Sequence, residues 1–403
     1  MATGIPPARA RRLADEYRSA LFNDVVPWWI DHSIDQEAGG YFSCLDREGK
    51  PYAFDKFTWP TARQVWMLSR LYNSERRNPV WLEAARHGAR WIQSHGFSGG
   101  EKMHFRTARD GTPLAGSLSL FSESFTAIAF AEFGKASGET LYTDRAKEMF
   151  ESLLERLGKP TDTAQLGYPL KTEFHVHGHD MIRLTIARVF TETINDPRWM
   201  REVDRSIDSM LRLHWKPELP AFLENVSPTG STMFELPEGR MIMPGHTCES
   251  AWMMLEVARE RGDEALKATC RKIVLSAMEA GWDEEYGGLR YLLNLDHSPA
   301  HPLEADLKLW WVQVEALYAL LLLWDSAGSE GDTEVERWYD LVHSYTFDLY
   351  PDDRYGEWIG YRNRDGSPIF TAKANGWKGF FHLPRVLLRG YQLLSAATKG
   401  ELG

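Results

Sequence analysis

Two histidines stand at the start of apolar, helix-forming stretches, in Pro-Gly-His246 and Phe-Phe-His382. Each is followed three residues later by a charged residue, Glu249 or Arg385, and residues at this spacing share one face of a helix. A carboxylate beside an imidazole fixes its tautomer and adjusts its basicity, whereas a guanidinium can hold an oxygen atom. Histidine is the side chain used most often to move protons near neutral pH. The pattern predicts general acid–base chemistry.

Polar residues recur at similar intervals along the chain, each near the start of an apolar helical stretch. The six residues are Arg63, Glu123, His179, His246, Glu315 and His382, and the intervals between them are 60, 56, 67, 69 and 67 residues. The three clearest copies of the repeat share an Asp that is followed four residues later by a Gly. This Asp is Asp35, Asp283 or Asp352, and it lies before the helical stretch of its copy. A repeat that cannot bury its own apolar face must stack on its neighbours. Six copies in 403 residues predict closure into a ring.

Helical periodicity predicts twelve helices in six pairs. They cover residues 8–26, 61–74, 79–95, 122–137, 141–157, 179–194, 197–214, 246–261, 264–280, 308–326, 332–349 and 380–397. Short alternating segments with Gly-bearing turns separate the two helices of most pairs and favour β-hairpins. The sequence therefore predicts an all-α protein, an (α/α)6 barrel forming a single domain over residues 1–403. The short β-hairpins are expected in the loops at the active-site end.

In such a barrel the starts of the inner helices converge on a central cleft. The convergent polar set is Arg63, Glu123, His177, His179, His246, Glu249, Glu315, His382 and Arg385. Trp59 and Trp377 lie near these positions, and flat aromatic rings suit the C–H faces of a sugar, whereas Trp66 is expected in the core. This set is the candidate binding site.

The run His175-Val-His177-Gly-His179-Asp180 places alternate histidines close together, a pattern that could bind zinc. No cysteine or further histidine lies nearby in the sequence, and Gly178 indicates a bend. We therefore predict that His177 and His179 contact substrate and that the protein has no metal site.

The bulk composition excludes several classes of partner. The net charge is −11 and no basic cluster is present, so neither nucleic acid nor an anionic membrane is an expected partner. No apolar run approaches the roughly 20 residues that span a bilayer. Three cysteines without CxxC spacing fit a reducing compartment, and the first residues lack a secretory apolar region, so we expect a cytoplasmic protein.

The chain resembles the N-acylglucosamine 2-epimerase (renin-binding protein) family from about residue 13 to residue 390. The matching stretches are Phe57-Thr-Trp-Pro-Thr-Ala-Arg63, Leu120-Phe-Ser-Glu123, Leu223-Glu-Asn-Val, Met243-Pro-Gly-His246-Thr-Cys-Glu249, Lys308-Leu-Trp-Trp-Val-Gln-Val-Glu315 and Lys378-Gly-Phe-Phe-His382-Leu-Pro-Arg385. The resemblance implies an (α/α)6 barrel, a homodimer, and action at C2 of a free monosaccharide or disaccharide. It also implies that His246 and His382 are the acid–base pair, that Arg63 and Glu315 contact substrate, and that Glu249 and Arg385 support them.

The resemblance favours a 2-epimerase that interconverts N-acetylglucosamine and N-acetylmannosamine by removing and returning the C2 proton. The alternative is an aldose–ketose isomerase of the mannose or sulfoquinovose type, or a cellobiose or mannose 2-epimerase, because geometry alone decides where the proton returns. A glycoside hydrolase, which uses two carboxylates, and a non-enzymatic binding protein are the other classes considered. The chemistry requires no cofactor. Ala374-Asn-Gly-Trp-Lys378-Gly lacks the double glycine of animal members of the family, which leaves activation by ATP open.

Overall fold

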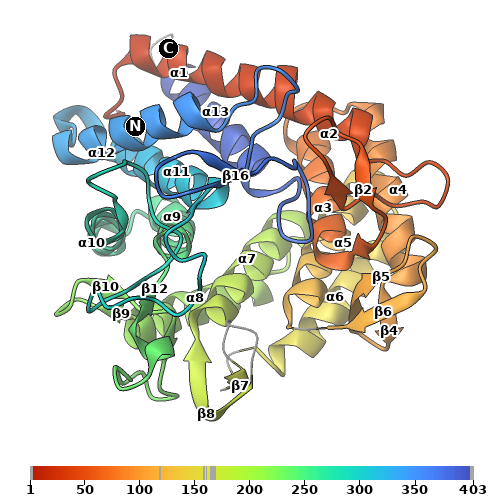
Figure 1. The fold of residues 1–403 in the computed structure, drawn as a ribbon, viewed down its shortest axis with the longest axis horizontal. Helices are drawn as coiled ribbons and strands as arrows, with labels where there is room; N and C mark the ends of the chain where they lie inside the picture. Colours follow the sequence, from red (N-terminus) through yellow and green to blue (C-terminus); the bar gives the residue numbers. More distant parts are fainter. Residues whose placement is uncertain (1–2, 118, 158, 160, 164–168, 400–403) are drawn as a thin grey trace.

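The computed structural model describes residues 3–117, 119–157, 159, 161–163 and 169–399. Helices dominate, and they alternate along the chain between a largely buried set and an amphipathic set (Figure 1). The buried set is α3 (Thr58–Ser74), α5 (Phe121–Ser137), α7 (His177–Ile194), α9 (Pro244–Arg261), α11 (Trp310–Ser326) and α13 (His382–Lys399). In α11 every side chain from Trp310 to Asp325 is buried, as expected for a helix that is apolar on all sides.

The amphipathic set covers the buried one, each helix packing against a buried partner. It consists of α1 (Pro7–Ser19) continued by the π-helix η1 (Ala20–Val25) and α2 (Val26–His32), α4 (Pro79–His95), α6 (Thr140–Leu154), α8 (Met200–Ser209) between the 3₁₀-helix η2 (Pro197–Trp199) and the π-helix η3 (Met210–His214), α10 (Glu264–Gly281) and α12 (Thr333–Leu349). The twelve predicted helical segments are therefore confirmed. Their ends differ by a few residues, and the first segment continues to His32.

Local signals explain most helix ends. The side chains of Asn78 and Asp196 are N-caps, because each accepts a hydrogen bond from the second backbone N–H after it. Gly138 and Gly262 end their helices in the left-handed conformation, which glycine adopts without strain. Ser122 begins the predicted helix 122–137, but it is not an N-cap, because α5 begins at Phe121 after Leu120. Gly158, which follows the predicted helix 141–157 and would suit its end, lies outside the described residues.

Short antiparallel strands fill the segments that precede each buried helix. They are β1 (Cys44–Leu45), β2 (Pro51–Ala53), β3 (Lys56–Phe57), β4 (Phe97–Gly99), β5 (Lys102–Thr107), β6 (Pro113–Gly116), β7 (Thr161–Thr163), β8 (Pro169–Val176), β9 (Trp215–Lys216), β10 (Ala221–Phe222), β11 (Asn225–Val226), β12 (Met241–Ile242), β13 (Leu293–Asn294), β14 (Lys308–Leu309), β15 (Tyr361–Arg362) and β16 (Pro368–Phe370); the 3₁₀-helices η4 (Pro237–Arg240) and η5 (Gly328–Glu330) complete the elements. The predicted hairpins are thus present, although most strands contain only two or three residues.

Several strands pair with a strand of the next repeat, and β8 also pairs with β7 of its own repeat. β3 pairs with β5, β8 with β11, β12 with β13, and β14 with β15. Leu45 near the N-terminus forms a bridge with Ala374 near the C-terminus. Beneath it, the ring of Trp66 on α3 lies 5.3 Å from that of Phe381, the residue before α13. The first and last repeats are therefore neighbours in space.

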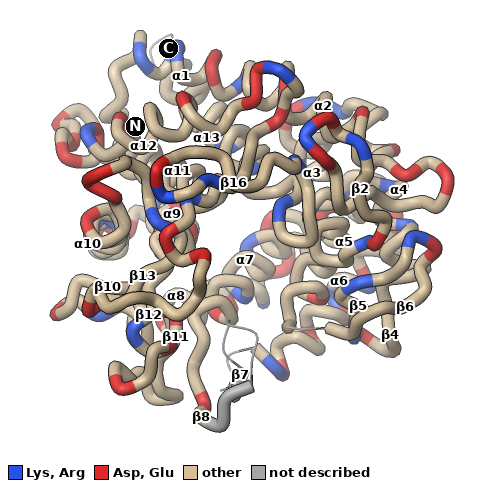
Figure 2. The backbone as a smooth tube through the Cα atoms, viewed as in Figure 1, with Lys and Arg blue, Asp and Glu red and all other residues tan. Residues whose placement is uncertain are grey.

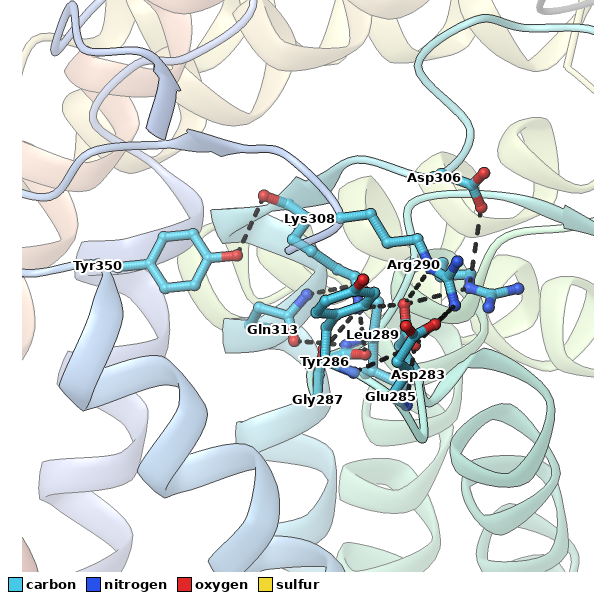
Figure 3. Close-up of polar contacts among 12 residues, drawn as sticks. Asp283, Glu285, Tyr286, Gly287, Leu289, Arg290, Asp306, Lys308, Gln313 and Tyr350 are labelled. Carbon is cyan, nitrogen blue, oxygen red and sulfur yellow. Dashed lines mark hydrogen bonds and ion pairs between the residues drawn. The ribbon is translucent and has the colours of Figure 1, made fainter. Parts of the chain in front are cut away.

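Three junction clusters, each an Asp, a Lys and an Arg, also join neighbouring repeats. They are Asp35 with Lys56 and Arg109, Asp283 with Lys308 and Arg364, and Asp352 with Lys373 and Arg47. The Asp–Lys distances are 2.9, 3.2 and 2.8 Å, and all three lysine side chains are fully buried. Figure 3 shows Asp283 and Lys308 of the second cluster, in which Lys308 also donates to the carbonyl of Gly287. In each cluster the Arg comes from the next copy of the repeat.

The repeated layout of these junctions follows from the turn at each Asp. The carbonyl of Asp35, Asp283 and Asp352 accepts from the N–H four residues later, and the carboxylate accepts from backbone N–H groups inside the turn. Burial alone would raise the pKa of each carboxyl, but the bonds from Arg and Lys outweigh it and hold the pKa far below its usual range. Every Asp is therefore ionised and matched by opposite charge.

The surface carries both signs of charge. Figure 2 shows Lys and Arg interspersed with Asp and Glu along the chain. Among the helices that the structure describes, none has the length and apolar character needed to cross a membrane.

Candidate active site

His246, on the first turn of α9, is held by a glutamate from a loop. Its Nδ1 lies 3.1 Å from Oε2 of Glu224, between β10 and β11, and the other oxygen of Glu224 lies 3.4 Å from Nδ1 of His177. The Nε2 of His177 lies 2.7 Å from Oγ of Ser250, so both of its nitrogens contact protein groups and its side chain is fully buried. His177 thus lies against Glu224 and Ser250, where its contacts orient the Glu224 carboxylate, and the expected contact of His177 with substrate stays a prediction.

His382, the first residue of α13, has a different set of partners. Its Nδ1 lies 2.7 Å from Oε1 of Glu315, and the same oxygen accepts from Arg385 at 2.6 Å. The second oxygen of Glu315 accepts from Nε1 of Trp252 at 2.7 Å, and Arg385 also donates to Glu249 at 2.5 Å. Because a carboxylate only accepts, Glu315 places the imidazole proton on Nδ1 and leaves Nε2 with a lone pair.

In the described structure Glu249 adjusts the pKa of His246 through its charge, as expected, but the hydrogen bond that holds the His246 imidazole comes from Glu224. His246 and Glu249 lie on one face of α9, but Glu249 is taken by Arg385 and His246 by Glu224. Glu315, expected to contact substrate, lies five residues inside α11 and supports His382. Helical spacing identified residues that share a face, whereas the partners come from neighbouring helices and loops.

Trp311 lies against both histidines. Its ring centroid is 5.1 Å from that of His246 and 5.5 Å from that of His382. The two imidazoles therefore border one aromatic surface at the start of α11, although they come from helices far apart in the sequence. Neither Trp311 nor Glu224 was predicted from the sequence as a site residue. The Leu223-Glu-Asn-Val stretch was a usable signal for Glu224, but it precedes no helix and so fell outside the repeat pattern.

The surroundings shift the pKa values of the two histidines in opposite directions. Burial is the largest single influence on His246 and lowers its pKa, but the carboxylates of Glu224, Glu249 and Glu315 together outweigh it and the pKa is raised. For His382, burial and the nearby positive charge of Arg63 hold the pKa well below its ordinary value. The surroundings therefore favour the protonated form of His246 and the neutral form of His382.

Arg63 is a buried cation at the edge of this group. Its guanidinium lies over the rings of Trp59, Phe125 and Phe381, at 4.6, 4.0 and 4.6 Å from their centroids. Burial lowers its pKa to about 9. Among the described residues Arg63 has no ion-pair partner within 4.0 Å, and its Nε has no hydrogen-bond partner. It is a charge available to a ligand.

The remaining predicted site residues, Glu123, Trp377 and His179, make their contacts in the described structure with residues other than His246 and His382. The carboxylate of Glu123, buried on α5, accepts from the N–H of Met103 at 3.4 Å and from Ser117 at 3.3 Å. Trp377 is 56% exposed, and its ring lies 5.4 Å from that of Trp59. His179 is half-buried on the first turn of α7, and burial lowers its pKa to about 4. No contact joins His179 to either His246 or His382 in the described part of the chain.

Three groups of side chains have the donor atoms and spacing to bind a metal ion. They are His175, Asp180 and His214; His177, Glu224 and His246; and Glu249, Glu315 and His382. In the last two groups, the facing atoms are already joined by hydrogen bonds or by the guanidinium of Arg385. His175 and His177 belong to different groups, so the alternating histidines of the sequence do not converge on one point.

Comparison with known proteins connects this arrangement to a family. The sequence profile described as N-acylglucosamine 2-epimerase (GlcNAc 2-epimerase) matches residues 40–385. The chain is 36% identical over 386 residues to the N-acylglucosamine 2-epimerase of Mus musculus, a match that covers 92% of this chain and 90% of the relative. It is 24% identical over 408 residues to the cellobiose 2-epimerase of Bacteroides fragilis, covering 93% of this chain and 98% of the relative.

The fold is shared with solved structures as well. The cellobiose 2-epimerase from Bacillus thermoamylovorans superposes with a TM-score of 0.80 at 17% identity, and the match covers 95% of this chain and 99% of that one. The profile match spans most of the chain and contains both histidines, Arg63, Glu315 and Arg385. The chain belongs to the N-acylglucosamine 2-epimerase family.

Proposed function

We propose that the protein is an isomerase that interconverts N-acetylglucosamine and N-acetylmannosamine by removing and returning the proton at C2. The observation that carries this proposal is the pair of histidines bordering Trp311 with pKa values shifted in opposite directions. An epimerisation needs a base on one face of C2 and an acid on the other. The similarity to N-acylglucosamine 2-epimerases supports the choice of sugar.

The chemistry starts from the open-chain sugar, whose C1 aldehyde acidifies the neighbouring C2–H. His382 is the base, because Glu315 holds its proton on Nδ1 and its Nε2 lone pair is free to take the C2 proton. His246 is the acid, because Glu224 stabilises its protonated form and leaves Nε2–H to deliver a proton. Delivery on the opposite face inverts C2, and the roles exchange in the reverse direction.

Between the two proton transfers, negative charge moves onto the C1 oxygen. Arg63 is the buried cation without an ionic partner among the described residues, and we assign it to that oxygen. A donor fixed in place before the reaction stabilises such an oxyanion at little reorganisation cost. Trp59 and Trp377, which contact each other beside Arg63, form the proposed surface for the sugar.

The six helix pairs are proposed to form the closed (α/α)6 barrel of a single domain over residues 1–403. The Leu45–Ala374 bridge and the Arg47–Asp352 ion pair, both joining the first repeat to the last, support closure. We further propose a cytoplasmic homodimer that needs no cofactor for the chemistry and that acts on a free sugar, with neither nucleic acid nor membrane as partner. Three buried free cysteines are compatible with a reducing compartment.

A deuterium experiment tests the function. The protein is incubated in D₂O separately with N-acetylmannosamine, mannose, sulfoquinovose and cellobiose, and the products are followed by NMR. The proposal expects deuterium at C2 together with N-acetylglucosamine from the first sugar. A ketose with deuterium at C1 from mannose or sulfoquinovose, and no reaction of N-acetylmannosamine, would identify an aldose–ketose isomerase instead. Products of lower mass from cellobiose would indicate hydrolysis.

A further inference from the structure

A second cluster of histidines lies behind the proposed active site. His175 is the last residue but one of β8, Asp180 lies on the first turn of α7, and His214 ends the π-helix η3. All three are buried, with 7%, 0% and 0% of their surface exposed. π-Helical turns are rare and frequently occur where a side chain must be redirected for function, and η3 directs His214 toward Asp180. The mechanism proposed above does not use these residues.

The hydrogen bonds of His214 leave one buried nitrogen without a partner. Its Nδ1 lies 2.7 Å from the carbonyl oxygen of Leu223, which can only accept, so the proton is on Nδ1. Nε2 therefore carries a lone pair, and it has no hydrogen-bond partner in the described part of the chain. The nearest acidic atom is Oδ2 of Asp180, at 4.0 Å. Two electron-rich atoms thus face each other in a buried space, an arrangement that a cation between them would stabilise.

The neighbouring atoms complete a coordination set. Nε2 of His175 lies 2.8 Å from Oδ2 of Asp180, and the donor atoms of the three residues all lie within 4.8 Å of one another. Oγ of Ser209 lies 2.6 Å from the same oxygen and offers a fourth ligand. Ligands of a tetrahedral zinc ion with bonds of ~2.0–2.2 Å lie roughly 3.4 Å apart, so the His214 ring has to approach by less than about 1 Å.

The contacts outside this set also match those of a metal site. Ligating histidines commonly donate their other N–H to a backbone carbonyl, as His214 does to Leu223, and this bond fixes the ring and its tautomer. Arg183 forms an ion pair with Oδ1 of Asp180 at 3.0 Å, so Oδ2 is the carboxylate oxygen left to face the metal position. His175 can bind the metal through Nε2 if its proton moves to Nδ1. The bond from Nε2 to the metal then takes the place of the present hydrogen bond between Nε2 and Asp180.

We propose that His175, Asp180 and His214, with Ser209, bind one divalent transition-metal ion of the Zn²⁺ type, and that this ion has a structural role. It would tie β8, the start of α7 and η3 together behind His177, whose ring lies 5.5 Å from that of His214. His177 in turn contacts Glu224, the residue that holds His246. The expectation of no metal site rested on the absence of a further histidine near His175–Asp180 in the sequence, and His214 supplies it through the fold.

Metal binding can be measured on the purified full-length protein. After treatment with a chelator and removal of the chelate, ZnCl₂ is titrated while bound zinc and the Tm are followed, and CoCl₂ is used in parallel for its visible spectrum. We expect one equivalent of zinc, a rise in Tm of about 2–4 °C at saturating zinc, and the intense visible bands of tetrahedral cobalt. Failure of the unmodified protein to bind one equivalent at micromolar concentration overturns the proposal, whatever the variants do.

Variants assign the ion to its site. His214→Phe keeps an aromatic ring and removes Nε2, and Asp180→Asn removes the charge, so each should weaken zinc binding at least 100-fold. His343→Phe, which disrupts a histidine–glutamate contact between α12 and α1, is the matched control and should leave binding unchanged. His246→Asn should also retain the zinc. Loss of zinc in His246→Asn with retention in His214→Phe would place the ion in the His177, Glu224 and His246 group and contradict the assignment.

Discussion

The junction clusters and the histidine site both contain buried charged side chains, but the charges are paired in the junctions and partly unpaired at the histidine site. In the junctions each Asp is matched by a fully buried Lys and by an Arg from the next repeat. Burial lowers the pKa of Lys308 to about 8, and its partner Asp283 opposes that change. At the histidine site, Arg63 has no ionic partner among the described residues. The pKa of His246 is raised there and the pKa of His382 is lowered.

This difference in pairing distinguishes charges that stabilise the fold from charges that we expect to act on a substrate. A matched buried pair gains little over apolar packing, but removing one partner leaves the other charge uncompensated and is costly. A buried charge that has no partner in the protein can be stabilised by the opposite charge of a ligand or of a transition state. We therefore expect substitutions in the two regions to affect different quantities, stability in the junctions and turnover at the histidines.

The largest effect is expected at the two histidines. His246→Asn and His382→Asn should each lower turnover by about 10²–10⁴-fold, because each face of the planar intermediate needs its own proton carrier. Turnover is measured as the rate of C2 inversion, with circular dichroism to confirm folding. His343→Asn, which alters a histidine–glutamate contact outside the site, is the control and should keep wild-type turnover. Either variant retaining more than about a tenth of the activity would contradict the two-histidine assignment.

Asp352→Ala should lower the free energy of unfolding by about 3–5 kcal/mol, because Lys373 loses the partner of its buried ammonium group. Denaturant unfolding measures the change, and turnover at a temperature where the variant is folded should stay close to that of the wild type. Lys50→Ala removes an exposed ion pair with Glu48 and should have no measurable effect on stability. Equal stability of the two variants would remove the proposed role of the junctions.

Arg63→Lys should lower kcat by about 10²-fold, because the charge is kept but the planar donor pair is lost. Tm should change little, since Arg63 forms no ion pair in the described structure. Steady-state kinetics and thermal unfolding of the same preparations test this pair of expectations. A strongly lowered Tm with normal kcat would instead make Arg63 part of the structural charges.

The smallest expected effect is a shift in pH dependence. The activity needs a neutral His382 and a protonated His246, so it should fall as pH drops through the pKa of His382 and as pH rises through the pKa of His246. Glu224→Gln removes a charge that raises the pKa of His246, so the alkaline limb of kcat/KM should move to lower pH by about one unit. The acid limb should stay, because Glu224 does not contact His382. An unchanged alkaline limb would show that Glu224 does not control His246.

Much of the fold could be predicted from the chain. The twelve helices follow from apolar periodicity and from caps such as Asn78, and the six-fold spacing of polar residues placed His246 and His382 at the starts of buried helices. The shared helix face of His246 and Glu249 did not reveal the hydrogen-bond partner of His246, because helical spacing does not decide which neighbour fills the space in front of that face. Glu224 and Trp311 were missed for the same reason, since each acts through a contact made across elements.

The sequence by itself determined the local conformations and the repeat, because helix periodicity, capping and the Asp–Gly turns depend on residues close together in the chain. Only the tertiary structure decided the charge states of the two histidines and the meeting of His175 with His214. Glu224 lies 22 residues before His246, and His214 lies 34 residues after Asp180, in loops and helix ends without a periodic pattern. A pKa depends on burial and on which charges lie within a few ångströms. Those distances exist only once the helices have packed.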